Sequence, residues 1–332
     1  MKLATRILGI LGVLLIAALL LREGASAVAT LLRQAGWVLL WLLPLHAAVL
    51  WLDTWGWSAM LSAQGERQKF PPGPLFLIGA VREAVNRLLP TANVGGQILG
   101  VRLLMLRGVP GPRAAGNLIV EVLMSLVSQC LFFATALLCL LDVANAVAWT
   151  REAELVLAVA AAVIVALSWL LRHGSIFERL GHRVESILGD SSPWRRLLLR
   201  SPELDHEIRQ LCNAHRYLMT TVAGQYLALV AGVAEDWLIL RWIGHPVGVP
   251  AALILEGLTQ LVRQFIIVVP AGVGLQEAGL IGIGALLGVD APAALALSLA
   301  KRAREIVFSL PFLLGWQWFE ARRLGRRRAQ PG

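Results

Sequence analysis

Charged residues interrupt the apolar segments of this sequence, at positions where they could bind an ionic ligand. In the second half, Arg263 precedes a Pro-Ala-Gly-Val-Gly break, Glu277 follows it, and Lys301 and Arg302 lie in the next apolar segment. A charge that faces lipid at mid-depth costs about 2.5–3.5 kcal/mol on insertion scales. Such side chains therefore face a protein interior or a wet cavity, where arginine and lysine donors can hold an anionic headgroup.

The first half carries a comparable set of charges. Glu83 and Arg87 are four residues apart and can pair on a helix, as Lys301 and Glu305 can in the second half. Two interpretations stay open, an internal network that balances its own charge and a substrate-binding site. The candidate substrate-binding residues are Arg82, Arg87, Gln97, Arg102, Glu121, Arg263, Glu277, Lys301 and Arg302. Glu235 and Asp236, nearer the outer interface, are expected to be solvated.

The composition places these charges in a membrane. Of 332 residues, 57% are hydrophobic and only 15% are charged, which excludes an ordinary soluble protein. Runs of about 20 apolar residues are long enough to cross the hydrocarbon core. Six segments are predicted to span, namely Leu3–Leu21, Ala35–Leu52, Asn117–Leu141, Leu155–Leu171, Tyr217–Ile243 and Ala293–Phe319. The predicted fold class is an all-α polytopic integral membrane protein.

Two further apolar regions, Leu75–Leu106 and Ala251–Val289, are broken near their middles and are predicted to be re-entrant hairpins. Their breaks contain the hairpin backbone residues Pro90, Gly95, Gly96, Pro270, Gly272 and Gly274. Placing Pro90 over Pro270 with two one-residue gaps matches Gln97 with Gln276 and Gly108 with Gly288. A kink at each proline within packed helices is the simpler alternative.

Each half then has two spanning helices, a hairpin and one more spanning helix, so the second half is expected to be inverted. The predicted organisation is a first repeat over residues 1–142, a second over 143–319 with a cytoplasmic segment at 172–216, and a basic tail at 320–332. Inverted repeats with broken helices in matching places are typical of secondary transporters. Glu121 lies 31 residues after Pro90 and Lys301 lies 31 residues after Pro270, so the two are expected to face each other across the pseudo-twofold axis.

The net charge of +9 is explained by topology rather than by nucleic acid. With the N-terminus inside, 19 of the 30 Lys and Arg residues fall on the cytoplasmic side and four on the outer side, while seven lie at membrane depth. This asymmetry follows the positive-inside rule, so both termini are expected to be cytoplasmic, in the bacterial inner membrane. Alternatively, residues 1–21 are a cleaved signal peptide ending near Ala25-Ser-Ala27.

No cofactor or metal is expected from the sequence. Cys212, His215 and His206 are close together, but nothing completes a ligand set. The segment Phe177–Leu188 has one apolar face, which would suit either the cytoplasmic leaflet or a loop packed under the membrane domain.

The chain resembles the flippase-like transmembrane family that includes the membrane half of lysylphosphatidylglycerol synthases, and most of all its hopanoid-biosynthesis-associated members. The motifs that carry the resemblance are Leu89-Pro-Thr-Ala-Asn-Val-Gly-Gly-Gln97 with Arg102, Pro270-Ala-Gly-Val-Gly-Leu-Gln-Glu-Ala278 and Ala300-Lys-Arg302. The resemblance implies lipid transport, without synthase activity because the soluble transfer domain is not expected. Gln97 and Val122 stand where many members have Glu and Arg, which makes a less charged ligand such as a triterpenoid plausible.

Three classes of function are therefore compared. The first is a lipid transporter or flippase, whose partner is a membrane lipid, either a hopanoid or an anionic lipid. The second is an intramembrane enzyme with Glu277 as its acid or base and Arg263 or Arg302 holding a phosphate. The third is a non-catalytic scaffold for lipid-biosynthesis enzymes. A homodimer is a further possible partnership, and no nucleic acid is expected.

Overall fold

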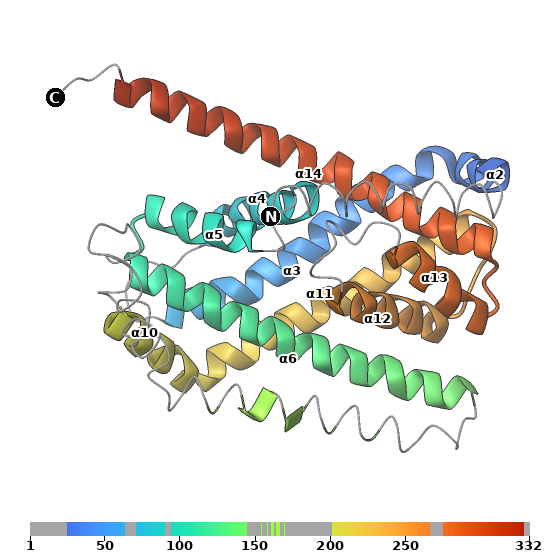
Figure 1. The fold of residues 1–332 in the computed structure, drawn as a ribbon, viewed down its shortest axis with the longest axis horizontal. Coiled ribbons are helices and arrows are strands. Elements are labelled where there is room, and N and C mark those ends of the chain that lie inside the picture. Colours follow the sequence, from blue (N-terminus) through green and yellow to red (C-terminus); the bar gives the residue numbers. More distant parts are fainter. Residues whose placement is uncertain are drawn as a thin grey trace, which may run out of the picture. The chain divides into compact units, whose positions relative to one another are not determined.

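The computed structural model describes residues 25–63, 71–89, 94–144, 201–265 and 275–328, with a few isolated positions between 154 and 169 (Figure 1). Every regular element within these ranges is a helix. In chain order they are α2 (Ala25–Ala35), the 3₁₀ helix η1 (Gly36–Trp41), α3 (Leu42–Ala63), α4 (Pro72–Leu88), α5 (Gly95–Leu106), α6 (Gly111–Ala144), α10 (Ser201–Asn213), α11 (His215–Trp242), α12 (Val249–Phe265), α13 (Leu275–Leu286) and α14 (Ala291–Arg328).

Several predictions fall on residues outside the described ranges. They concern the first segment Leu3–Leu21 with its signal-peptide alternative, most of Leu155–Leu171, the amphipathic segment Phe177–Leu188, and the hairpin residues Pro90, Pro270, Gly272 and Gly274.

Three stretches of the described chain are long and apolar enough to cross a membrane. They are Val28–Ala63, Gly111–Asp142 and His215–Trp242, and they cover the predicted spans in those regions. Large apolar side chains remain exposed along them, among them Leu138 on α6 and Met219 on α11. Exposed apolar surface of this extent suits contact with lipid. The prediction of an all-α polytopic membrane protein is confirmed.

The predicted last span, Ala293–Phe319, lies within the single helix α14. Its sequence is interrupted by the charges from Lys301 to Glu305, so α14 is less apolar than the three stretches above. Its first turns pack against the protein and its later turns expose Ile306 and Leu314. The helix therefore combines an interior segment, a charged segment and a segment with an apolar outer face.

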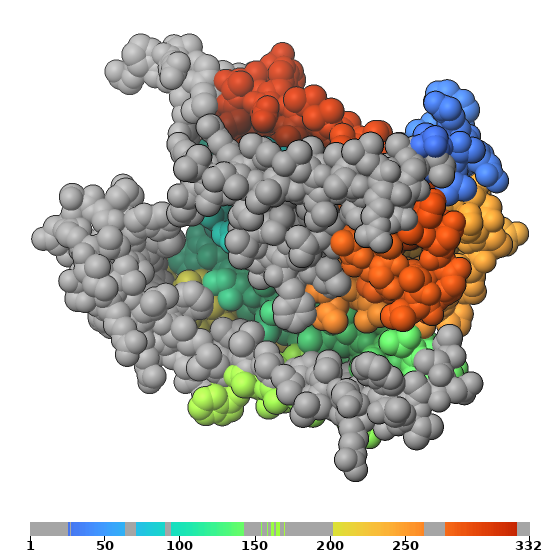
Figure 2. All heavy atoms as spheres, turned by 45° about the vertical axis from the view of Figure 1, so that its right-hand side comes forward, coloured from blue at the N-terminus to red at the C-terminus, as the bar shows by residue number. Residues whose placement is uncertain are grey.

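The chain divides into two compact units. The first comprises residues 1–50, 77–97 and 230–332. Its apolar core draws on α2, α3, α11, α12, α13 and α14, and is centred on Ile239, Leu255, Leu280 and the fully buried run Ala293–Leu297. In Figure 1, α12 and α13 lie side by side, and Figure 2 shows their golden and orange surfaces in contact.

The second unit comprises residues 51–76 and 98–229. Within it α3 and α11 cross at two glycines, because a Cβ on Gly224 would lie 2.9 Å from the Cα of Gly56. The Thr221 hydroxyl donates a hydrogen bond to the Gly56 carbonyl at 2.9 Å across the same crossing. Small residues let membrane helices approach this closely. The short helix α10 packs along α6, where Arg113 pairs with Glu207.

The two predicted hairpin regions each contain two described helices, α4 and α5 in the first and α12 and α13 in the second. Residues 90–93 and 266–274, on which the predicted breaks fall, lie outside the described ranges. Gly96 is required where α5 begins: its N–H donates to the Asn86 side-chain oxygen at 2.8 Å, and a Cβ there would lie 2.5 Å from the Arg82 carbonyl oxygen.

The turns that follow α5 and α13 match bond for bond. Val109 N–H donates to the Leu104 carbonyl as Val289 N–H donates to that of Gly284, and Gly108 and Gly288 have φ of +90° and +75°. Because both helices run without interruption into these turns, the alignment of their two sequences needs no one-residue gap. Without the gap, the same difference in residue number relates every position of α5 to its match in α13, and it aligns Gln97 with Glu277 rather than with Gln276. That the two halves are inverted stays a prediction.

Candidate functional site

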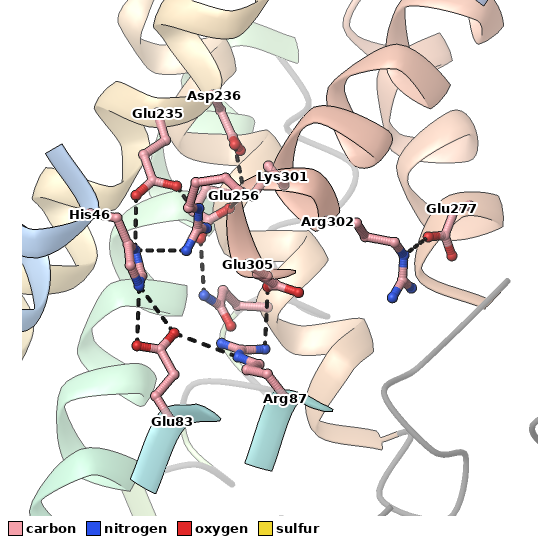
Figure 3. A network of polar contacts seen from close by, with 12 residues as sticks. His46, Glu83, Arg87, Glu235, Asp236, Glu256, Glu277, Lys301, Arg302 and Glu305 are labelled. Atoms are coloured by element: carbon pink, nitrogen blue, oxygen red, sulfur yellow. Dashed lines mark hydrogen bonds and ion pairs between the residues drawn. The ribbon is translucent and has the colours of Figure 1, made fainter. Parts of the chain in front are cut away.

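A cluster of buried ionisable side chains lies in the first unit, with His46 of α3 at its centre (Figure 3). His46 Nε2 lies 3.1 Å from both carboxylate oxygens of Glu83 on α4. Its Nδ1 lies 3.1 Å from Oε1 of Glu235 on α11 and 2.7 Å from Nη1 of Arg304 on α14. Arg304 Nη2 also contacts the other oxygen of Glu235 at 2.8 Å. Four helices thus supply one connected group.

Lys301 anchors a second group of charges one turn earlier on α14. Its ammonium lies 2.6 Å from Oδ1 of Asp236 and 2.5 Å from Oε2 of Glu256. Asp236 is 1% exposed and Glu235 is 3% exposed, so the expectation that this acidic pair is solvated is wrong. Both residues lie inside because α11 continues well beyond them and carries both side chains into the core between α12 and α14.

Arg87 joins α4 to α14. Its guanidinium lies 3.8 Å from Glu83, which confirms the pair predicted from the four-residue spacing, and 3.6 Å from Glu305. The spacing of Lys301 and Glu305 had suggested a pair as well. In the structure Lys301 reaches α11 and α12, while Glu305 reaches α4.

Arg302 and Glu277 form an ion pair that Figure 3 shows to one side of the His46 cluster. Glu277 lies in the first turn of α13, next to the break, and its side chain is fully buried. It accepts hydrogen bonds from Arg302 Nε and, at 3.2 Å, from the Ser298 hydroxyl. An acidic residue in this position also interacts favourably with the helix dipole. Arg302 Nη2, although buried, has no hydrogen-bond partner.

The other candidate residues are spread more widely. Arg82 is buried and donates from Nη2 to the Gln97 side-chain oxygen at 2.6 Å, within the first hairpin. Arg102 is exposed on α5. Glu121 is buried in the second unit. Arg263 lies in α12, and only its backbone is among the described atoms.

The two residues that sequence reasoning missed are His46 and Glu256. His46 interrupts the apolar run of α3, and Glu256 stands alone in the apolar half of α12. An ionisable residue in an apolar membrane segment is itself a sign of function, and this signal could have identified both. Reasoning from pairs four residues apart does not find them, because their partners are on other helices.

The arrangement can move or hold charge. Within the described ranges no group of three or more His, Cys, Asp or Glu side chains is placed to hold a metal ion. Buried arginine and lysine donors can bind anionic oxygens, and the imidazole of His46 can take up or release a proton.

The fold and the cluster define a helical membrane protein with an ionic interior. The chain belongs to the family described as the lysylphosphatidylglycerol synthase TM region, whose model matches residues 6–315. The resemblance found in the motifs is thereby confirmed at the level of the family. No curated protein and no solved structure shows significant similarity to the chain. Family membership links the protein to membrane lipids.

Proposed function

We propose that the protein is a flippase-like lipid transporter of the bacterial inner membrane, with both termini cytoplasmic. Membership in a lipid-related membrane family supports a lipid as the cargo. Hopanoids or related lipids are the favoured class, on the strength of the motif resemblance alone. The excess of basic residues on the expected cytoplasmic side supports the orientation.

The observation that carries the proposal is the Arg302–Glu277 pair at the start of α13. Glu277 fixes Arg302 through Nε, while the buried Nη2 has no hydrogen-bond partner among the described residues. An unsatisfied buried donor on a charged group is costly, by about 1–3 kcal/mol or more. A phosphate or hydroxyl oxygen of a lipid headgroup would satisfy it.

Translocation of a labelled lipid tests the proposal. The purified protein is reconstituted in vesicles containing fluorescent phosphatidylglycerol, and a membrane-impermeant quencher is added outside. Wild-type protein should expose inner-leaflet lipid to the quencher, whereas Arg302→Ala and Glu277→Gln should slow this by about 10- to 100-fold, the equivalent of one charge-assisted hydrogen bond. Wild-type rates in both variants would overturn the site.

Arg113→Ala is the matched control, because Arg113 also forms an arginine–glutamate pair, with Glu207 at 3.3 Å, on α6 outside this site. It should translocate lipid at the wild-type rate. Thermal unfolding and gel filtration of each variant separate loss of function from loss of fold. Mass spectrometry of the same vesicles addresses the enzyme alternative, since a transporter leaves the mass of the labelled lipid unchanged. Identification of the lipids that copurify tests the hopanoid assignment.

A further inference from the structure

One nitrogen of His46 lies between a donor and an acceptor. Nδ1 is 2.7 Å from Nη1 of Arg304, which can only donate, and 3.1 Å from Oε1 of Glu235, a carboxylate oxygen that accepts. A nitrogen that carries a proton bonds the acceptor, and a bare nitrogen bonds the donor. The protonation state of His46 therefore decides which of the two contacts is a hydrogen bond.

We infer that His46 is a proton-binding site that couples lipid movement to proton movement. Protonation of His46 changes the hydrogen bonds that bind Arg304 to His46 and Glu235. This inference rests on the proposed transport function and adds its coupling ion. The step is a transfer of H⁺ from water-borne hydronium to Nδ1, forming one N–H bond and releasing water.

In the neutral state the contact between Nδ1 and Glu235 Oε1 is not a hydrogen bond, while the other close contacts are. His46 Nε2–H donates to Glu83, Nδ1 accepts from Arg304 Nη1, and Arg304 Nη2 donates to Glu235. When Nδ1 gains a proton it donates to Glu235 Oε1, and Arg304 loses its acceptor on the ring while facing a second positive charge. Like charges at this separation repel, so α14 is pushed from α3 at this point.

The ionisable residues around His46 include more acidic than basic groups. Its direct partners Glu83, Glu235 and Arg304 are linked through Glu83 to Arg87 and Glu305, and Lys301 with Asp236 and Glu256 forms the neighbouring group one turn earlier on α14. Among these described residues five are acidic and three are permanently basic, so a protonated His46 brings the group closer to neutrality. Asp236 Oδ2, buried without a hydrogen-bond partner, also reflects this surplus of acid.

The connection to the lipid site runs through α14. Arg304 and Arg302 are two residues apart and point to different sides of the helix, so they do not share ligands. A displacement of α14 at Arg304 nonetheless moves Arg302 relative to Glu277, because both arginines are fixed to one rigid helix. Binding of a proton on one side of α14 thus changes the geometry of the headgroup site on the other side of the helix.

The first experiment observes the proton directly and does not depend on transport. Protein labelled with ¹⁵N-histidine is placed in lipid nanodiscs, and the ring signals are followed from about pH 5 to about pH 9, on both sides of the ordinary imidazole value. The His46 signals are assigned as those lost in His46→Gln, or in His46→Asn if the first variant does not fold. They should titrate, and Arg304→Gln should shift the midpoint. A His46 ring that keeps one protonation state throughout would overturn the inference.

The second experiment measures lipid distribution in vesicles with a pH difference across the membrane. With one proton coupled to one lipid, a difference of one pH unit should change the leaflet ratio of the labelled phosphatidylglycerol about tenfold at steady state. His46→Gln should abolish the pH dependence. His245→Gln is the control, because His245 pairs with Asp290 at the protein surface.

The outcomes separate the two proposals. Absence of lipid movement in wild-type vesicles under all conditions contradicts the transport function, while the nanodisc titration still tests the proton site. Lipid movement that is equal with and without the pH difference, or equally pH-dependent in His46→Gln, contradicts the proton coupling and leaves the transport function standing.

Discussion

At the scale of single residues, Lys301 shows how the interior depends on complete pairing. One ammonium is shared by the carboxylates of Asp236 and Glu256, which belong to different helices. A buried ion group of this kind contributes little net stability compared with a well-packed apolar core, but removal of one member leaves uncompensated charge. The sequence places Lys301 at membrane depth, yet it does not indicate that Asp236 and Glu256 meet it there.

Substitution of Lys301 by Met should therefore destabilise the protein by about 3–5 kcal/mol, because two buried carboxylates lose their common cation. The double variant Lys301→Met with Asp236→Asn should recover part of that loss. Denaturant unfolding of the protein in a mild detergent measures both. A single variant as stable as wild type would contradict the pairing.

At the scale of elements, local sequence predicts the helices well and their contacts poorly. Hydrophobic runs predict α3, α6 and α11, and the helices α4, α5, α12 and α13 lie in the two predicted hairpin regions. The contact of Glu83 with Arg87 is also predicted, because both residues lie on one helix. His46, Glu256 and the burial of Asp236 are not, since each depends on residues between about 37 and 258 positions away along the chain. The sequence alignment of the two repeats also contains a one-residue gap, which only the geometry of the turns after α5 and α13 shows to be unnecessary.

The crossing of α3 and α11 gives a prediction at this scale. Gly224→Leu places a side chain where the Gly56 backbone already lies within 2.9 Å of the Cβ position, so the helices must separate. Overpacking of this kind costs about 1–3 kcal/mol or more. The variant should unfold at a lower temperature than Gly232→Leu, whose position on the same helix has its nearest neighbour, a flexible Glu256 oxygen, at 3.9 Å. Equal unfolding temperatures would argue against the close crossing.

At the scale of the whole molecule, orientation follows from the distribution of basic residues. The C-terminal end of α14 is rich in arginine, from Arg322 to Arg328, and the positive-inside rule predicts that such a segment is cytoplasmic. A fluorescent protein fused after Gly332 should mature and fluoresce, and an alkaline phosphatase fused there should be inactive. The reverse pair of results would contradict the orientation.

The distance along α14 indicates how deep in the bilayer the ionic cluster lies. Trp318 is exposed and Arg322 lies over its ring at 3.7 Å, a combination typical of the boundary between headgroups and acyl chains. Arg304 is fourteen residues earlier, about 21 Å along a straight helix. Half of the hydrocarbon core is only about 15 Å thick. If α14 runs straight along the bilayer normal, His46 and its partners would therefore lie past the centre of the bilayer as measured from the arginine-rich end, and the proposed proton site would have its shorter path to the opposite face.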